Sequence, residues 1–358
     1  MPPVPRLPMK IAILDDYQGA ASKYFDSLKP NFETTAFPDT LPPYNHPSTS
    51  EDVKKQLVER LKPFTVISSM RERTAFPKSL LEKLPNLKLL LNTASRNNSI
   101  DLEAAKELGI VVTGTPKPGN DPDSTTEHTV ALILGIARNV AWDDRVVKGG
   151  GWQTTFATGL SGRTFGTVGL GTLGTSVAKI MHLAFNMKII AWSSSLTQET
   201  ADQQARDSGL APEGEDGEKV FKVVSKEELF STADVVSVHL VLSDRSRGIV
   251  GERDLELMKK TALLINTSRG PLVQQDALLN TLQKGSIRGA ALDVFDLEPL
   301  PADSPWRSIK WGEEGRSHVL LTPHMGYVEE ATVNAWFQAQ VENIQRWHDG
   351  EELKNLML

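Results

Sequence analysis

The chain has 358 residues, of which 39% are hydrophobic and 23% charged, with a formal net charge of -6 at pH 7. This length exceeds one typical core, so we expect two domains in an ordinary globular protein. The mild negative charge without a basic block argues against nucleic acid as a partner. Cysteine is absent, which excludes disulfides, thiolate metal sites and thiol nucleophiles and fits a reducing compartment.

The N-terminal sequence MPPVPRLPMK lacks the apolar core of a signal peptide. No apolar run along the chain reaches the length that spans a membrane. We therefore expect a cytoplasmic protein without a membrane partner.

Short β-rich runs alternate with helical stretches over the first third of the chain. Such alternation predicts a parallel sheet with helices on its faces. The predicted strands are Lys10–Asp15, Thr65–Met70, Leu87–Thr93 and Ile110–Thr113, and the predicted helices are Glu51–Leu61, Pro77–Leu84 and Leu102–Leu108.

A long amphipathic segment follows, from about Ser124 to Lys148. A Ser/Thr cluster opens it and three glycines close it, as is typical of helix ends. The pattern predicts one long helix. It leaves open whether this helix bridges two domains or is an ordinary core helix.

The second half repeats the alternation of strands and helices from Phe165 onward. Residues 208–219 are rich in glycine and charge and predict an exposed excursion. A final amphipathic helix is expected at Glu329–His348. The predicted strands have the sequences FGTVGLG, MKIIAW, ADVVSVHLV, ALLINTS, GAALDVF and HVLLTPH.

Gly169, Gly171 and Gly174 form a G-x-G-x-x-G pattern directly after the apolar run Phe165–Val168. The pattern also opens a helix-like stretch, which is the context that dinucleotide binding requires. The glycines permit a tight turn, close approach of a pyrophosphate and close helix–strand packing, and a helix N-terminus attracts the anion. The sequence thus predicts a dinucleotide site, the alternative being a glycine-rich turn without a ligand.

The strand MKIIAW ends at three serines, Ser193–Ser195. An NAD-specific site usually places Asp or Glu here to accept hydrogen bonds from the ribose hydroxyls. Without that carboxylate no negative charge repels the 2′-phosphate of NADP. No Arg stands directly beside the serines to bind that phosphate, however, and the nearest basic residue downstream is Arg206. The expected cofactor is NAD or NADP, and we favour NADP or dual use.

Reduction of a keto acid needs a cation for the carboxylate, a proton donor for the developing alkoxide and a partner for that donor. Arg269 in INTSRG, Glu298 in DVFDLEP and His324 in TPHMG supply these groups. Each follows a predicted strand, and open parallel sheets bind ligands at the carboxyl ends of their strands. Taken singly, each residue has a structural alternative, but their joint placement indicates a catalytic site.

From about Thr65 to Tyr327 the sequence resembles the D-isomer-specific 2-hydroxyacid dehydrogenases, most strongly over LINTSRGPLV, AALDVFDLEP and LTPHMGY. The resemblance implies a nicotinamide-dependent oxidoreductase that interconverts a small 2-keto acid, such as glyoxylate or hydroxypyruvate, and its D-2-hydroxy acid. By motif it implies Arg269 as the catalytic, substrate-binding Arg, His324 as acid/base and Glu298 as the partner of His324.

The resemblance also implies which residues contact the cofactor, with Asp293 near the nicotinamide carboxamide. We expect no metal site. The cofactor-binding residues so implied are Gly169, Gly171, Thr172, Leu173, Gly174, Ser193, Leu240, Thr267, Ser268, Asp293 and Gly326.

Arg71, in the run SMRERT, occupies a family position that lines the substrate cleft, although it also fits a solvated Arg. Many members have a glycine-containing loop for the substrate carboxylate where this chain has SRNNSID at 95–101. We expect Arg71, Arg96, Asn97 and Arg269 to bind substrate. Other departures are Val241 in place of a usual Pro and inserted residues at Trp311–Arg316.

The implied fold class is α/β, with two Rossmann-like, doubly wound parallel-sheet domains. A flavodoxin-like substrate-binding domain is expected at residues 1–117 and 326–358, so it is discontinuous in sequence. An NAD(P)-binding Rossmann domain is expected at residues 118–325. The resemblance further implies a homodimer through the cofactor domains, since two-fold association is the commonest oligomer.

Other functions remain open beside the leading one. Within the family, D-3-phosphoglycerate dehydrogenase in serine biosynthesis is an alternative. From another class, an NAD(H)-sensing binding protein similar to the C-terminal-binding corepressors keeps the same motifs. Formate dehydrogenase is disfavoured because Gln is expected in place of Glu298.

Overall fold

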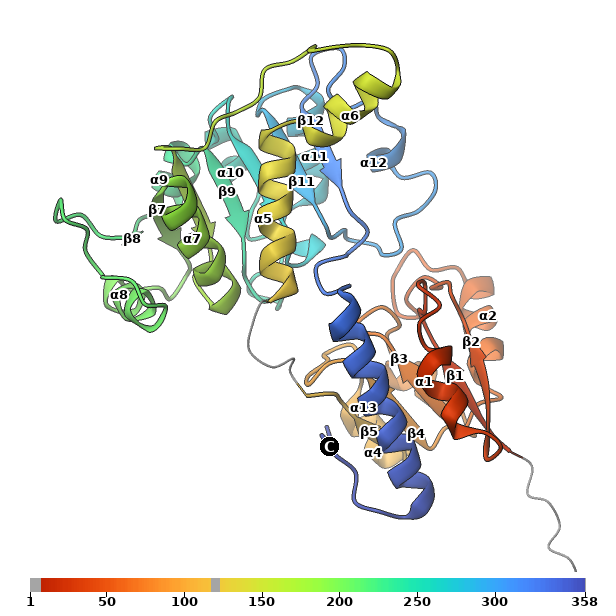
Figure 1. Cartoon of the computed structure of the whole chain (residues 1–358). Coiled ribbons are helices and arrows are strands. Elements are labelled where there is room, and N and C mark those ends of the chain that lie inside the picture. The colour runs from red at the N-terminus through yellow and green to blue at the C-terminus, as the bar shows by residue number, and fades with distance from the viewer. Residues whose placement is uncertain (1–7, 117–122, 358) are drawn as a thin grey trace, which may run out of the picture. The chain divides into compact units, whose positions relative to one another are not determined.

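The computed structural model describes residues 8–116 and 123–357, and the chain separates into two compact units (Figure 1). The first unit comprises Met1–Asn120 with Val328–Leu358, and the second unit comprises Asp121–Tyr327. The predicted domain boundary between residues 117 and 118 lies outside the described residues. At its other end the second unit extends to Tyr327, two residues beyond the predicted boundary at 325.

In the first unit, five described strands form a parallel sheet in the order β2-β1-β3-β4-β5. The order reverses between β1 and β3, as in doubly wound folds. The sequence pattern does not predict the edge strand β2, because Phe32 alone among its residues is buried. The strands are β1 (Met9–Ile13), β2 (Phe32–Ala36), β3 (Val66–Ser69), β4 (Leu89–Asn92) and β5 (Val111–Thr113).

Helices pack around the first sheet. The Ser50 side chain accepts a hydrogen bond from the amide of Val53, which caps the start of α2. The last helix, α13, returns to this unit, where Gln340 accepts a hydrogen bond from Ser68 at 2.6 Å. The helices are α1 (Ser22–Phe25), α2 (Glu51–Leu61), α3 (Lys78–Leu81), α4 (Leu102–Glu107) and α13 (Glu330–Asp349), with a short 3-10 helix at Asp26–Leu28.

In the second unit, seven described strands form a parallel sheet in the order β12-β11-β10-β9-β6-β7-β8. The order reverses between β6 and β9, so ligands are expected beyond the carboxyl ends of these strands. The strands are β6 (Thr164–Val168), β7 (Lys188–Trp192), β8 (Phe221–Val223), β9 (Val235–Val238), β10 (Leu263–Asn266), β11 (Gly289–Leu292) and β12 (His318–Leu321).

Both faces of the second sheet are covered. Val236 and Leu264 enter one hydrophobic cluster, while their neighbours Val235 and Leu263 enter another. Successive residues of a strand point to opposite faces, so these strands read as continuous apolar runs. The remaining helices are α7 (Thr172–Phe185), α8 (Gln198–Asp207), α9 (Lys226–Thr232), α10 (Glu252–Leu257), α11 (Gln275–Gln283) and α12 (Pro305–Ser308), with a 3-10 helix at Gly270–Leu272.

The predicted single helix from Ser124 to Lys148 is wrong. The segment forms α5 (Ser124–Ala137) and α6 (Val140–Lys148), separated by a break at Asn139, which has a φ of 56°. Asparagine tolerates this left-handed conformation better than most residues and is favoured just beyond helix ends. Helix α5 packs on α7, β10, β11 and β12 and is therefore a core helix of the second unit.

Candidate active site

The glycine-rich turn joins β6 to α7 at the carboxyl edge of the second sheet. Gly169 has a φ of 101°, which favours glycine, and a Cβ there would lie 2.9 Å from the carbonyl oxygen of His239. A Cβ at Gly174 would lie 2.2 Å from the Gly169 carbonyl oxygen, whereas one at Gly171 would meet nothing within 4 Å. No side chain caps the first amides of α7. These amides and the open side of the turn fit a dinucleotide pyrophosphate.

Two further predicted cofactor residues, Thr172 and Leu173, begin α7 beside this turn. Ser193 follows β7, the neighbouring strand, and is partly exposed. Leu240 follows β9, on the other side, and its Cδ2 flanks Gly169. The fold thus brings these residues to one edge of the sheet.

Thr267 and Ser268 follow β10 and are largely buried. The hydroxyl of Thr267 forms a 2.8 Å hydrogen bond with that of Thr129 on α5. The hydroxyl of Ser268 donates to the carbonyl of Val238 at 2.7 Å. Both hydroxyls therefore hold neighbouring elements together at the place where cofactor contacts are predicted.

Arg269 follows the same strand and extends from a backbone that is fixed by Asn266. The amide nitrogen of the Asn266 side chain donates to the Arg269 carbonyl at 2.9 Å, and its oxygen accepts from the Ser268 amide at 3.1 Å. Nη1 of Arg269 donates to the Ser268 carbonyl at 2.7 Å. The side chain is only partly exposed, which strengthens its attraction for a carboxylate.

Glu298 and His324 approach each other from the loops after β11 and β12. Oε2 of Glu298 lies 2.6 Å from Nδ1 of His324, and the side chains are 23% and 15% exposed. Oε1 of Glu298 accepts a hydrogen bond from the Phe295 amide at 2.9 Å, which fixes the carboxylate. With Nδ1 facing Glu298, Nε2 is the ring nitrogen that the predicted acid/base role would use.

The turn that carries His324 is pinned on both sides by Asp293. His324 has a φ of 56°, a conformation that costs about 1–2 kcal/mol outside glycine. Its amide donates to the Asp293 carbonyl at 2.8 Å. The carboxylate of Asp293 accepts from the amides of Met325 at 2.8 Å and Gly326 at 3.0 Å. These bonds hold the strained residue in place.

Two side chains complete the surroundings of the fully buried Asp293 carboxylate. Thr322 donates to its Oδ1 at 2.6 Å, and Nε2 of His128, from α5, lies 3.1 Å from both Oδ1 and the Thr322 hydroxyl. Burial acts to raise the pKa of Asp293, but the hydrogen bonds from His128, Thr322 and Met325 outweigh it and hold that pKa below its usual value. The carboxylate is therefore ionised at neutral pH.

His239 is a second histidine at this edge that the sequence analysis did not single out. It follows β9 beside Gly169, and its Nε2 lies 2.8 Å from the hydroxyl of Ser237. Burial lowers the pKa of His239 to about 4. The imidazole is therefore neutral at physiological pH and adds no charge next to the predicted dinucleotide turn.

Arg71 lies in the first unit, directly after β3, and has a φ of 52°. Its carbonyl accepts hydrogen bonds from the side-chain amides of Asn92 at 2.8 Å and Asn97 at 2.7 Å. Its own amide donates to the Thr93 hydroxyl at 2.9 Å. The guanidinium lies 5.9 Å from the ring centroid of Trp336, on α13 of the same unit. The backbone of this residue is thus held in an uncommon conformation.

Asn97 and Arg96 differ in exposure. Asn97 is 5% exposed, and its side-chain oxygen also accepts hydrogen bonds from the Ser99 amide and hydroxyl, at 2.8 and 2.6 Å. Arg96 is exposed. The side chain of Asn97 therefore shapes the loop at Arg71, and its predicted contact with substrate stays a prediction.

Among residues 8–116 and 123–357, no cluster of His, Cys, Asp or Glu is arranged to hold a metal ion. The helices of this described part include none that is long and apolar enough to cross a membrane.

Comparison with known proteins agrees with this geometry. Residues 130–326 match the family described as D-isomer specific 2-hydroxyacid dehydrogenase, NAD binding domain. A glyoxylate reductase from Aeropyrum pernix is 37% identical over 78% of this chain and 78% of that protein. A glyoxylate reductase from Korarchaeum cryptofilum is 31% identical over 92% of this chain and 91% of that protein. A D-3-phosphoglycerate dehydrogenase from Methanocaldococcus jannaschii is 32% identical over 85% of this chain and 53% of its own length.

Solved structures show the same fold. A putative D-3-phosphoglycerate dehydrogenase from Ralstonia solanacearum superposes with a TM-score of 0.79 and 31% identity, covering 98% of this chain and 96% of that one. A phosphoglycerate oxidoreductase from Vibrio cholerae O395 superposes with a TM-score of 0.78 and 35% identity, covering 96% of this chain and 99% of that one. The predicted fold class and family are confirmed. The chain belongs to the D-isomer specific 2-hydroxyacid dehydrogenase family and is a nicotinamide-dependent oxidoreductase.

Proposed function

We propose that this enzyme reduces a small 2-keto acid, such as glyoxylate or hydroxypyruvate, to its D-2-hydroxy acid. The observation that carries the proposal is the 2.6 Å contact between His324 and Glu298, at the sheet edge that also bears Arg269 and the glycine-rich turn. A paired histidine is a proton donor, and an arginine beside it suits a carboxylate. Similarity to glyoxylate reductases favours a short substrate.

The reaction needs one hydride and one proton, and the bound nicotinamide supplies the hydride. Arg269 binds the substrate carboxylate and polarises the adjacent carbonyl. His324, protonated, gives its Nε2 proton to the carbonyl oxygen as the carbon is reduced, so that a hydroxyl forms. Glu298 stabilises the imidazolium through Nδ1 before the transfer. In the reverse direction neutral His324 takes the hydroxyl proton.

A panel of 2-keto acids, assayed with NADH and NADPH in parallel, tests this function. We expect the highest kcat/KM with a short 2-keto acid and a product of D configuration on chiral chromatography. The second candidate is oxidation of D-3-phosphoglycerate, favoured by the similarity to phosphoglycerate dehydrogenases. A much higher kcat/KM for D-3-phosphoglycerate than for any small hydroxy acid would replace the first proposal by the second.

We propose that the enzyme uses NADPH at least as well as NADH. Support comes from Ser193, which stands at the end of β7 where an acidic residue would repel the 2′-phosphate. Ser193→Asp introduces that repulsion and should shift the ratio of kcat/KM values towards NADH by about tenfold or more. An unchanged ratio would mean that the adenosine ribose is recognised by other residues.

In the first unit we propose Arg71, Arg96 and Asn97 as substrate-binding residues. Two of them carry a positive charge, which suits the carboxylate or a distal anionic group of the substrate. Arg71→Met and Arg96→Met should raise KM for the keto acid while leaving KM for the cofactor near the wild-type value. Unchanged KM values for every keto acid tested would remove both arginines from the site.

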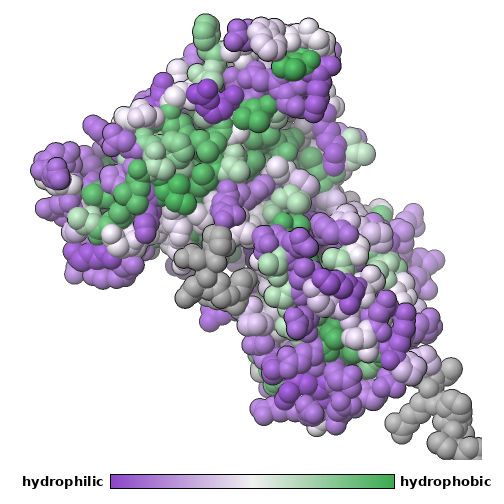
Figure 2. Space-filling model, in the orientation of Figure 1, coloured by the Kyte–Doolittle hydropathy of each residue, from purple (hydrophilic) through white to green (hydrophobic). Residues whose placement is uncertain are grey.

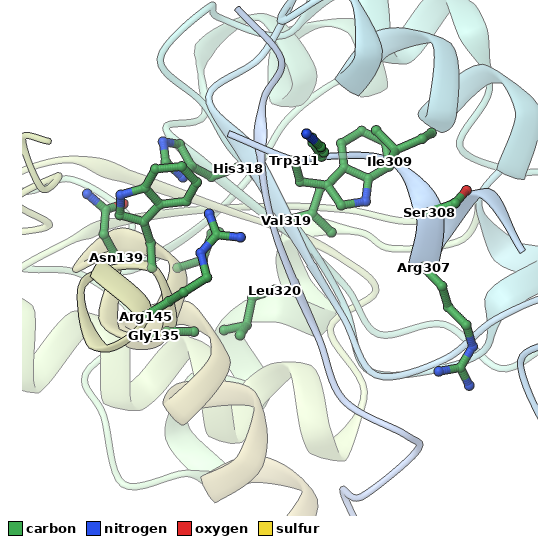
Figure 3. A pocket seen from close by; sticks show the side chains of 14 residues that line it. Gly135, Asn139, Arg145, Arg307, Ser308, Ile309, Trp311, His318, Val319 and Leu320 are labelled. Atoms are coloured by element: carbon green, nitrogen blue, oxygen red, sulfur yellow. The ribbon is translucent and has the colours of Figure 1, made fainter. Parts of the chain in front are cut away.

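We propose a homodimer formed through the second unit. Trp152 and Phe156 are 73% and 92% exposed. The same unit has a cavity of about 380 Å³ whose walls include Trp311 and His318 (Figure 3). In Figure 2 apolar residues gather over α5 and α7, where Leu183 is 61% exposed. Exposed aromatic and aliphatic side chains on one unit support a two-fold contact, in which the same surface patch of each copy meets its counterpart.

Light scattering with Phe156→Asp tests the dimer. We expect a dimer mass for the wild type at micromolar concentration and a monomer mass for the variant, because a buried carboxylate disrupts an apolar contact. Lys148→Asp, which changes the charge of an exposed residue at the end of α6, is the matched control and should stay dimeric. A monomeric wild type would refute the proposal.

We also propose a cytoplasmic location. The absence of cysteine from all 358 residues supports it, since such a chain has no disulfides to gain from an oxidising compartment. Cell fractionation with antibody detection tests it, and recovery of the protein in a secreted or membrane fraction would contradict it.

A further inference from the structure

We propose that His128 is a positioning residue for the reduction: by binding Asp293 and Thr322 it fixes the turn that carries His324. The proposal rests on the proposed role of His324 as acid/base. His128 belongs to α5, whereas the turn follows β12. The contact therefore links a core helix to the catalytic turn within the second unit.

The turn is built on Asp293. Its carbonyl accepts the His324 amide, and its carboxylate accepts the amides of the next two residues, Met325 and Gly326. The same carboxylate accepts the Thr322 hydroxyl, two residues before His324. A displacement of the Asp293 side chain would therefore move both flanks of His324 together.

His128 is the group that fixes the Asp293 side chain from outside the turn. Its Nε2 lies 3.1 Å from both Oδ1 of Asp293 and the Thr322 hydroxyl oxygen. Thr322 gives its own proton to Oδ1 at 2.6 Å, so both oxygens near His128 act as acceptors. Nε2 must therefore carry a proton, and the ring donates to the two acceptors. This assignment leaves Nδ1 as the acceptor nitrogen when the ring is neutral.

The position of His324 matters because hydrogen bonding to the reacting oxygen depends on sub-ångström placement. Misplacement of a reacting group by about 1 Å can lower a rate by about 100-fold. The residue also has a φ of 56°, so it relaxes to another conformation unless its surroundings hold it. Loss of the His128 donor would loosen Asp293 and allow that relaxation. Because Asp293 is also a predicted cofactor contact, the effect should fall on the chemical step beyond any change in cofactor affinity.

The experiment compares His128→Phe with His128→Gln. Phe keeps the ring and removes the donor, whereas the Gln amide can replace the Nε2–H group. We expect His128→Phe to lower kcat for keto acid reduction, measured at saturating cofactor, by about tenfold or more, which is a larger change than that in the Kd for NADH or NADPH. The deuterium isotope effect with 4-deuterated cofactor should rise, because the chemical step becomes more fully rate-limiting. His128→Gln should recover most of the lost kcat.

His182→Phe is the matched control, since His182 lies on α7 and bonds to the Met187 carbonyl away from the turn. It should leave kcat and the isotope effect unchanged. Near-wild-type kcat in His128→Phe would overturn the proposal, as would a loss in His128→Gln equal to that in His128→Phe. So would a loss confined to cofactor affinity.

A second measurement separates this proposal from the proposed function. His324→Ala is assayed beside the His128 variants and should lose about 1000-fold in kcat. If His324→Ala stays active, the acid/base assignment fails whatever His128 does. If His324→Ala is inactive and His128→Phe is normal, the assignment stands and His128 has no positioning role.

Discussion

Asp15 in the first unit and Asp293 in the second are buried carboxylates in two doubly wound units. Each lies beyond the carboxyl end of a strand, β1 or β11, and they are 2% and 0% exposed. Yet burial raises the pKa of Asp15 to about 6, against hydrogen bonds from Thr40 and Thr74, whereas the pKa of Asp293 lies below its usual value. Burial is similar in the two, but the outcome is opposite.

The difference lies in the donors. Asp293 accepts two backbone amides, a hydroxyl and an imidazole N–H. Asp15 accepts hydrogen bonds from the hydroxyls of Thr40 and Thr74, and the charges of Arg73 and Arg60 also act to lower its pKa. Hydrogen bonds to the ionised form offset the cost of removing a carboxylate from water. The ionised carboxylate of Asp293 is thus well stabilised at the proposed catalytic edge. The ionised form of Asp15, in the first unit, is stabilised less.

The largest expected effect comes from neutralising Asp293. Asp293→Asn keeps the shape, but its NH₂ group must face a backbone amide or the His128 donor, so charge-assisted bonds are lost and donors are left unpaired. We expect the free energy of unfolding of the second unit to fall by about 3 kcal/mol or more at pH 7. Urea denaturation measures it. A decrease in the free energy of unfolding below about 1 kcal/mol would mean that the four donors bind a neutral side chain at this position nearly as well as the carboxylate.

The same substitution at Asp15 should act in the opposite direction. The folded pKa of about 6 exceeds the unfolded value of 3.8, so the folded state binds more protons between these values. The stability of the first unit should therefore fall as pH rises from about 4 to 6, by up to about 3 kcal/mol, and Asp15→Asn should remove this slope. At pH 7 the variant should be the more stable protein. Asp39→Asn, at an exposed residue, is the control, and equal slopes in wild type and Asp15→Asn would contradict the prediction.

A further test at the proposed catalytic edge concerns the shape of the cationic group of Arg269. Arg269→Lys keeps the positive charge but removes the planar fork that binds a carboxylate through two parallel hydrogen bonds. We expect kcat/KM for the keto acid to fall by about 100-fold, or about 2.7 kcal/mol. Arg253→Lys, on the exposed side of α10, should have no effect. Wild-type-like kinetics in Arg269→Lys would remove Arg269 from the substrate site.

The sequence predicts the central strands of both sheets and one edge strand of each, β5 and β12, but not the other two edge strands. Buried strands such as β9 and β10 read as unbroken apolar runs, because both of their faces are covered. Strands β2 and β8 lie at sheet edges and carry exposed residues, so they lack this pattern. The break at Asn139 had a local signal, an asparagine inside a helical pattern, which the apolar periodicity on both sides concealed.

For the site, the motifs predict which residues reach the sheet edge and that Glu298 partners His324, but not the contacts that hold these residues in place. Chain topology alone places Arg269, Glu298 and His324 after parallel strands. The contacts of His128 and Asn97 depend on side chains brought together from distant segments, and no motif marks them. Short-range patterns cannot predict such contacts, because they follow from the packing of α5 on β11 and β12 and from the loop after β4.

Glu298 adds a third kind of carboxylate to the comparison, partly exposed and bonded to a titratable ring. In the proposed mechanism Glu298 holds Nδ1 of His324 at 2.6 Å and stabilises the imidazolium that donates the proton. Glu298→Gln keeps the shape and deletes the charge, so kcat for keto acid reduction should fall by about tenfold or more, with KM for the cofactor near the wild-type value. Glu256→Gln, on the exposed side of α10, should leave kcat unchanged. If kcat of Glu298→Gln equals that of the wild type, Glu298 acts through its bond to the Phe295 amide and shapes the loop without assisting proton transfer.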